Sequence, residues 1–372
     1  MRFFASVMAC IMAFTVNIIA YGEVHFSAVE ARACILIERK SGRVLYEMNA
    51  DELLPMASTT KIMTALLTLE RCDLSEIVTA SKNASAMPGT SIYLGEGEQL
   101  TVYQMLQGLL LRSGNDCAVA LAEHMSGSVK EFAYLMNERA KALDARAHFV
   151  NPEGLDIAGH LTSARGLALI ANEAMDFPLF RTLVQTERET LPWANNRYER
   201  VLSNKNKLLK SYSGATGVKT GFTKKAGRCL VFSAEREGME LLGVLLNCAN
   251  WFDAAAKLMD EAFDRYHMET VMQANEIIKQ IPIPNGMKNK MDIIAQQSMS
   301  IPVAEGERIS VVIKSEEQLT APLGMGQVVG CVEGLIDGEW IQSRPLVTRE
   351  AVTERTWRNA LMKIISKFNP IR

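Results

Sequence analysis

The chain has 372 residues, of which 48% are hydrophobic and 22% are charged. This composition excludes a disordered chain and supplies enough apolar material for a large core, and the length suggests two domains. The formal net charge of -2 produces no global field that favours nucleic acid, so we expect no nucleic-acid partner.

The N-terminal segment, residues 1–28, is predicted to be a signal peptide. Arg2 precedes an apolar run over residues 3–20, and small residues follow at Ser27 and Ala28, as cleavage by a signal peptidase requires. The run is nearly long enough to cross a bilayer, so an uncleaved membrane anchor is the alternative. We expect the mature chain to be exported and to act outside the cytoplasm.

The seven cysteines do not have the spacing of a metal site. No CxxC pair occurs, and the five histidines form no HExxH motif, so we expect no zinc, no other metal and no cofactor. Cys34 and Cys229 lie within apolar runs and are interpreted as small buried residues. Export permits disulfides, but the sequence does not choose their pairs.

The first half of the chain begins with strands and continues with helices. Residues 33–37 and 43–47 are predicted to form a hairpin. From Ser58 onward, the apolar residues follow a helical period. Further helices are expected at 101–111, 118–125, 129–143 and 165–175. The polar stretch 112–116 interrupts the first two of them.

The pattern returns to strands at residues 217–223, 228–234 and 240–246, and a helix follows at 253–266. The third of these strands is apolar on both faces, so it is expected to be central or covered by helices on each side. Strands from both ends of this region can meet in one sheet. The predicted fold class is therefore α+β, with an antiparallel sheet flanked by helices in a domain at 29–272.

The composition changes after residue 272. Short alternating runs separated by turn residues predict a small all-β domain at 273–350, with a sandwich as one arrangement. In the last segment, 355–372, apolar residues follow one helical face and basic residues lie on the others. Such a basic amphipathic helix is typical of membrane-surface binding. Docking of this helix on its own protein is the alternative.

Three short motifs carry the chemistry. Ser58 and Lys61 are three residues apart at the start of a helix, so their side chains share a face. A neutral lysine can take the proton of a serine nucleophile. A Ser-Lys pair by itself is usually an ordinary helix cap. Ser113 and Asn115 lie between two helices, where a hydroxyl can relay a proton and an amide can hold a substrate or the lysine.

The third motif, Lys219-Thr220-Gly221, lies on a predicted strand. A lysine and a hydroxyl can bind a carboxylate, and glycine lets a ligand approach the backbone. Together and in this order, the motifs match the SxxK, SDN and KTG signature of class A β-lactamases and penicillin-binding proteins. Here the middle motif reads Ser-Gly-Asn, which points away from a class A β-lactamase.

With these motifs the chain resembles the D-alanyl-D-alanine carboxypeptidases, the low-molecular-weight penicillin-binding proteins. The resemblance spans nearly the whole chain and includes ASTTKIMTA at 57–65, SGNDCAVALA at 113–122, NPEGL at 151–155 and KTGFTKKAGRCL at 219–230. It implies the penicillin-recognising, β-lactamase/transpeptidase-like fold. It also implies a serine enzyme that removes the terminal D-alanine of the peptidoglycan pentapeptide and binds β-lactam antibiotics. The basic tail would hold the enzyme on the outer face of the cytoplasmic membrane.

The resemblance assigns the roles in acyl transfer. Ser58 would attack the carbonyl of the penultimate D-alanine, and Lys61 would be the general base. Ser113 and Asn115 would line the cleft, with Ser113 as a candidate proton relay.

The same resemblance assigns substrate binding to the third motif. Lys219 and Thr220 would bind the terminal carboxylate, and Gly221 would allow close approach of the substrate backbone. The backbone N–H groups of Ser58 and Phe222 would form the oxyanion hole.

Two further polar residues receive no catalytic role, and two alternative functions remain. His160 is interpreted as structural, and Glu153 as a solvated loop residue without a role. A β-lactamase remains an alternative, although it would need neither an added β domain nor a membrane helix. A catalytically weak wall-binding or penicillin-sensing protein is the second alternative, and the intact motifs argue against it.

Overall fold

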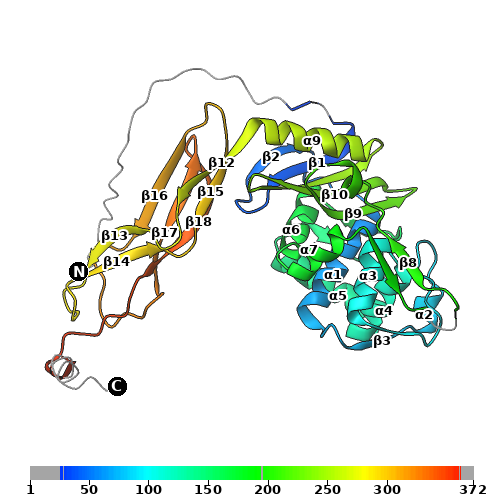
Figure 1. The fold of residues 1–372 in the computed structure, drawn as a ribbon, viewed down its shortest axis with the longest axis horizontal. Coiled ribbons are helices and arrows are strands. Elements are labelled where there is room, and N and C mark those ends of the chain that lie inside the picture. Colours follow the sequence, from blue (N-terminus) through cyan, green and yellow to red (C-terminus); the bar gives the residue numbers. More distant parts are fainter. Residues whose placement is uncertain (1–25, 28, 194–195, 360, 362–372) are drawn as a thin grey trace.

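The computed structural model describes residues 26–27, 29–193, 196–359 and 361. Most of the predicted signal peptide (residues 1–25 and 28) and most of the predicted basic helix lie outside the described residues. Among the helices that are described, none has the length and apolar character needed to cross a membrane. A helix-flanked sheet forms one part of the molecule and a β-rich region forms the other (Figure 1).

The first part is built on a five-stranded antiparallel sheet with the order β2-β1-β11-β10-β9. Its strands are β1 (Ala31–Glu38), β2 (Val44–Met48), β9 (Ala215–Thr223), β10 (Gly227–Arg236) and β11 (Met239–Cys248). The predicted hairpin and the three later strands are confirmed. β11 lies between β1 and β10, as its two-sided apolar pattern predicted. The ends of this region therefore meet in one sheet.

Helices cover both faces of this sheet (Figure 1). α9 (Trp251–Arg265) packs on one face against Leu36 and Phe232, whereas Ile35 and Val231 belong to the core on the opposite face. The alternation of side chains along each strand thus separates two apolar layers. The other helical segments are η1 (Ala57–Thr60), α1 (Lys61–Arg71), α2 (Lys82–Ser85), α3 (Val102–Gln107), the π-helical turn η2 (Gly108–Arg112), α4 (Asn115–Ser126), α5 (Val129–Ala142), α6 (Ala164–Ala174), α7 (Pro178–Gln185) and α8 (Leu208–Ser211).

The local elements differ from the sequence analysis in a few places. α4 begins at Asn115 rather than at residue 118, so Asn115 is the first residue of the helix and only Ser113 and Gly114 join the two helices. Neither α7 nor the hairpin of β7 (Arg188–Leu191) and β8 (Arg200–Ser203) was predicted from the sequence. The remaining short strands are β3 (Ile77–Thr79), β4 (Gln99–Thr101), β5 (Ala147–His148) and β6 (Leu161–Thr162).

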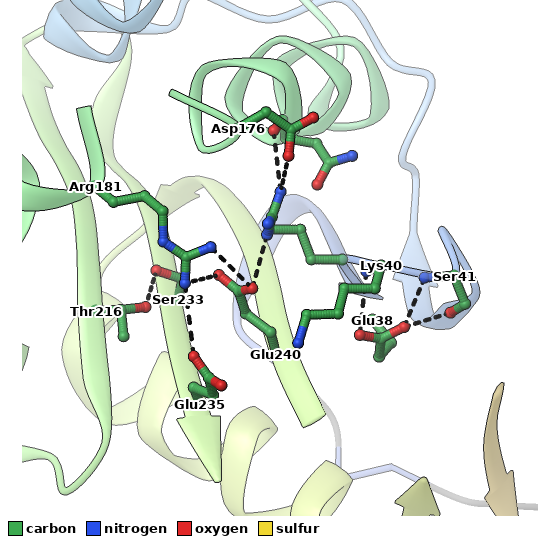
Figure 2. Close-up of polar contacts among 11 residues, drawn as sticks. Glu38, Lys40, Ser41, Asp176, Arg181, Thr216, Ser233, Glu235 and Glu240 are labelled. Carbon is green, nitrogen blue, oxygen red and sulfur yellow. Dashed lines mark hydrogen bonds and ion pairs between the residues drawn. The ribbon is translucent and has the colours of Figure 1, made fainter. Parts of the chain in front are cut away.

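A buried ion cluster fastens the helical layer to the sheet. The carboxylate of Glu240, which is 0% exposed at the start of β11, lies 2.9 Å from Arg39 Nε and 3.0 Å from Arg181 Nη2. Arg39 Nη1 also lies 2.7 Å from the carboxylate of Asp176. Figure 2 shows these contacts around Glu240, and it shows that Arg181 also reaches the carboxylate of Glu235, at 3.6 Å. Every buried charge in this cluster has a partner of the opposite sign.

The second part is a β-rich region with its own apolar core. Its strands form a two-stranded β12-β15 sheet and a five-stranded sheet with the order β13-β14-β18-β17-β16. The strands are β12 (Tyr266–Met272), β13 (Ile277–Pro282), β14 (Lys290–Ala295), β15 (Met299–Ala304), β16 (Ile309–Ser315), β17 (Val328–Ile336) and β18 (Glu339–Thr348). At the junction with the first part, Arg43 forms an ion pair with Glu307 and donates to the carbonyl of Pro302. The prediction of an all-β region is confirmed.

Six cysteines lie within the described residues, and all of them are free thiols. Cys34 and Cys229 are buried, as their apolar neighbours predicted.

Candidate active site

Ser58 lies in a tight turn that leads into α1. The preceding residue, Ala57, has φ of 49°, a left-handed conformation that is unfavourable for a residue with a Cβ atom. Two threonine side chains support this turn, since Thr59 Oγ1 donates to Met56 O at 2.6 Å and Thr60 Oγ1 donates to Ala57 O at 2.8 Å. Ser58 is half-buried and lines a cleft of about 710 Å³.

Lys61 is the centre of the polar contacts in this site. It is 0% exposed, because it begins a helix whose first two turns are packed inside the protein. Its Nζ donates to Ser58 Oγ at 3.0 Å, to Asn115 Oδ1 at 2.8 Å and to the backbone carbonyl of Glu153. These three acceptors come from separate chain segments and fix the amine next to the serine hydroxyl.

Burial gives Lys61 the properties of a base. It lowers the pKa of Lys61 to about 7, the nearby Lys205 lowers it as well, and the carboxylate of Glu153 opposes the shift. A substantial fraction of the amine is then neutral near pH 7. A neutral amine within hydrogen-bonding distance of a serine hydroxyl can accept its proton.

The second motif, Ser113-Gly114-Asn115, is fixed by the backbone conformation of Ser113 and by hydrogen bonds of Asn115. Ser113 has φ of 67° and is 3% exposed, and it lines the same cleft as Ser58. Asn115 donates through Nδ2 to Pro88 O at 2.7 Å, and its backbone N–H donates to Thr90 O at 2.7 Å. The side-chain amide is thereby oriented with its oxygen toward Lys61.

Asp116 supports this arrangement and was not identified in the sequence analysis. Its buried carboxylate accepts hydrogen bonds from Ser91 Oγ at 2.5 Å, from Ile92 N at 3.0 Å and from Leu94 N at 3.1 Å. Those contacts tie the 91–94 segment to the start of α4. Only the SGND resemblance pointed to this residue, because its partners lie more than twenty positions away.

The third motif lies on β9, at the edge of the sheet. Thr220, Gly221 and Phe222 line the cleft together with Ser58. A Cβ atom added to Gly221 would lie 2.9 Å from Ser58 N, so glycine allows β9 to approach the turn at Ala57 and Ser58 closely. The Phe222 side chain is 63% exposed. This exposure is compatible with a role for Phe222 through its backbone N–H group rather than through its ring.

The side chain of Lys219, the first residue of this motif, is buried rather than exposed in the cleft. It is 2% exposed, and its Nζ donates to Thr220 O at 3.0 Å. Burial and the charges of Lys61 and Lys205 hold the pKa of Lys219 well below its usual value. An anionic group that entered the cleft would relieve this excess of positive charge.

The interpretation of Glu153 as a solvated residue was wrong. Its side chain is 4% exposed, and its Oε2 has no hydrogen-bond partner among the described residues. Burial raises the pKa of Glu153, while Lys61 opposes that shift. The next residue, Gly154, has φ of 89°, and a Cβ there would lie 2.0 Å from Ala57 O. The loop at Glu153 and Gly154 therefore packs closely against the turn at Ala57 and Ser58.

His160 occupies a supporting position, in agreement with its structural interpretation. Its Nδ1 accepts from Val150 N at 3.0 Å, and its Nε2 lies 2.8 Å from Thr60 Oγ1. Burial lowers the pKa of His160 to about 4. The ring is therefore neutral near pH 7, and the contact at Nδ1 places its proton on Nε2, which donates to Thr60.

The cleft has a basic rim and no metal-ligating cluster. Lys205, Lys207 and Arg228 line it, as do the aromatic residues Trp251 and Phe252. No cysteine or histidine is among its described lining residues. The geometry suits attack by a serine on a carbonyl of an anionic substrate, without a metal ligand set at the point of attack.

Comparison with protein families agrees with the three motifs. Residues 21–250 match the family model described as D-alanyl-D-alanine carboxypeptidase. Residues 266–354 match the model described as penicillin-binding protein 5, C-terminal domain.

Individual proteins are similar over most of the chain. D-alanyl-D-alanine carboxypeptidase DacF of Bacillus subtilis is 35% identical over 87% of this chain and 86% of its own length. DacC of Escherichia coli, of the same description, is 33% identical over 92% of this chain and 90% of its own. The crystal structure of penicillin binding protein 5 from Haemophilus influenzae superposes with a TM-score of 0.75 and 28% identity, covering 88% of this chain and 99% of that one.

Proposed function

The chain belongs to the D-alanyl-D-alanine carboxypeptidase family, and from this premise we propose how its residues act. The protein is a serine peptidase that removes the terminal D-alanine of peptidoglycan stem peptides and binds penicillins. We propose that Ser58 is the nucleophile and Lys61 its general base. The observation that carries this assignment is the 3.0 Å contact from a fully buried lysine to the serine hydroxyl.

The acylation step uses the neutral form of Lys61. The amine takes the proton of Ser58 Oγ as the oxygen attacks the carbonyl carbon of the penultimate D-alanine. The N–H groups of Ser58 and Phe222 would hold the oxyanion, and such a donor typically contributes about 3 kcal/mol. Ser113 would relay this proton from Lys61 to the departing amine of D-alanine, which returns Lys61 to its neutral form. The close fit of Gly221 against Ser58 N supports a shared oxyanion hole.

Substrate binding and hydrolysis complete the cycle. Lys219 and Thr220 would attract the terminal carboxylate, while Asn115 would keep Lys61 in place and line the cleft. Water would then attack the Ser58 ester, with Lys61 accepting its proton, and release the shortened peptide. A β-lactam would form the same ester with Ser58 and leave it slowly.

The test is release of free D-alanine from a diacetyl-lysyl-D-alanyl-D-alanine peptide. We expect release by the parent protein and none by Ser58→Ala, whereas Ser310→Ala, at an exposed serine of β16, should release D-alanine at the parent rate. Labelling with a fluorescent penicillin should disappear in Ser58→Ala alone. Persistent labelling of that variant would reject Ser58 as the nucleophile. Rapid turnover of penicillin without release of D-alanine would favour a β-lactamase.

We further propose export and attachment to the outer face of the cytoplasmic membrane through residues 355–372. Support comes from the basic amphipathic pattern of this segment and from Trp357, which is 81% exposed, so its ring is available to a lipid surface. Sedimentation with anionic liposomes, with and without the residues after Glu354, tests the attachment. Equal pelleting of the two proteins would reject it. The division into 29–272 and 273–350 is proposed as the underlying domain organisation.

A further inference from the structure

Three potential metal ligands meet at the ends of α1 and α4 that are remote from the catalytic residues. The Sγ of Cys72, a carboxylate oxygen of Glu76 and a ring nitrogen of His124 all lie within 4.8 Å of one another. Cys72 caps the C-terminus of α1, and His124 lies in the last turn of α4. α1 has 11 residues, so the cluster is about 16 Å along the helix from Lys61.

The donor set has the chemistry of a zinc ligand set. Thiolate, imidazole and carboxylate are the three side-chain ligands that zinc accepts, whereas calcium and magnesium prefer oxygen alone. Tetrahedral bonds of about 2.0–2.3 Å separate the donor atoms by roughly 3.3–3.7 Å. The three side chains would therefore need to move by only about 1 Å to surround an ion.

The surroundings favour a cation and allow it to enter. Both helices direct their C-termini, the negative ends of their dipoles, toward the cluster. Glu76 accepts from Asp73 N at 2.7 Å through one oxygen, while its other oxygen lies 2.9 Å from His124 Nε2. The carboxylate is thus already oriented by the backbone. The side chains of Glu76 and His124 are partly exposed, and Cys72 is half-buried, so water can supply a fourth ligand.

We propose that Cys72, Glu76 and His124 bind a zinc ion, with water as the fourth ligand. On binding, the S–H bond of Cys72 breaks, its proton passes to solvent, and a zinc–sulfur bond forms. The ion joins the ends of α1 and α4, whose first residues are Lys61 and Asn115. The absence of paired cysteine motifs led the sequence analysis to expect no zinc. A search for short motifs does not find this cluster, because Glu76 and His124 are 48 positions apart in the chain.

Cobalt(II) is the probe for this site, because a cobalt–thiolate bond gives a charge-transfer band in the near ultraviolet. The full chain, stripped of metal with a chelator, is titrated with Co²⁺. We expect the band to saturate at one equivalent and to disappear when zinc is added. Cys72→Ser should lose the band, whereas Cys331→Ser, which removes the other half-buried thiol, should keep it. Absence of the band in the parent, or its persistence in Cys72→Ser, would overturn the proposal.

Two further variants separate ligation from misfolding. Glu76→Gln and His124→Asn change partly exposed side chains, and each should weaken cobalt binding at least tenfold while penicillin still labels the protein. Zinc should raise the thermal unfolding midpoint of the parent but not that of Cys72→Ser. Unchanged cobalt affinity in both Glu76→Gln and His124→Asn would reduce the site to a lone reactive thiol and reject it as proposed. The cobalt titrations and the thermal unfolding midpoints do not depend on the carboxypeptidase assignment, so failure of that assignment would leave them interpretable.

Discussion

The first part of the molecule contains two clusters of buried charge that behave in opposite ways. Around Glu240, each carboxylate or guanidinium group has an oppositely charged neighbour within 2.7–3.6 Å. Around Ser58, positive charge accumulates instead, since Lys61 and Lys219 are buried and the exposed Lys205 lies close enough to lower the pKa of both. Both clusters are held in place by the same sheet and helices.

The comparison shows that buried charged groups can either stabilise the fold or gain reactivity, depending on whether each one has a counter-ion. Paired ions remain charged in the interior, because each supplies what water would have supplied to the other. Two lysines buried together, with the Glu153 carboxylate offsetting the effect only in part at Lys61, lose part of their affinity for protons, and their pKa values fall. The Glu240 cluster therefore joins elements of the fold, whereas the Ser58 cluster contains a lysine whose pKa of about 7 suits the general base that we propose.

The largest effect is expected from Lys61→Met, which keeps the length of the side chain and removes the base. Acylation of Ser58 by penicillin should slow by about 10³-fold, within the range for loss of a general base. The unfolding midpoint should change little, because removal of a desolvated amine offsets the loss of its three hydrogen bonds. Stopped-flow acylation and thermal denaturation measure the two quantities. Lys290→Met, at an exposed lysine of β14, is the control and should acylate at the parent rate.

Glu240→Gln tests the other cluster. Loss of the carboxylate leaves Arg39 and Arg181 without their buried counter-ion, so the free energy of unfolding should fall by about 3 kcal/mol. Acylation of the folded protein should stay unchanged, because these residues do not line the cleft. Glu235→Gln is the matched control. Its carboxylate is 40% exposed and 3.6 Å from Arg181, so urea denaturation should show a loss of at most about 1 kcal/mol.

His160 should make stability depend on pH. Its pKa in the folded protein is about 4, against an ordinary value of 6.5, so between these values the unfolded chain binds a proton that the folded chain does not. The free energy of unfolding should therefore decline as pH falls from 6.5 to 4, by about 3 kcal/mol in total. His160→Gln should remove this component, whereas replacing His267, an exposed histidine of β12, should not. Identical pH profiles for parent and His160→Gln would contradict the prediction.

The smallest effect is expected from Glu153→Gln. The carboxylate raises the pKa of Lys61, so its removal should lower that pKa further and leave more neutral amine in mildly acidic solution. The acidic limb of the acylation profile should then move to lower pH, by about 1 unit at most. The rate of penicillin acylation, followed from pH 5 to 9, measures the limb. Asp156→Asn, at an exposed loop carboxylate, should leave the limb in place, and a shift toward higher pH in Glu153→Gln would refute the prediction.

The sequence identified the elements and motifs whose signals are local. The spacing of Ser58 and Lys61 at a helix start, the two-sided apolar pattern of β11 and the turn before β2 each depend on neighbouring residues. These features could be predicted because the periodicity of apolar residues in a helix or strand is visible within about a dozen positions. Asn115 illustrates the limit, since the motif was found but the helix start was displaced by three residues.

The sequence alone determined the residue types of the site and their order along the chain. Only the tertiary structure decided which of them are buried together. Glu153 was taken for a solvated residue because one carboxylate in a loop gives no sign of what will cover it. The contacts of Asp116 and Glu240 likewise join positions far apart in the chain. Burial and long-range pairing are properties of packed elements, and burial is what lowers the pKa of Lys61 from the ordinary range of a lysine to about 7.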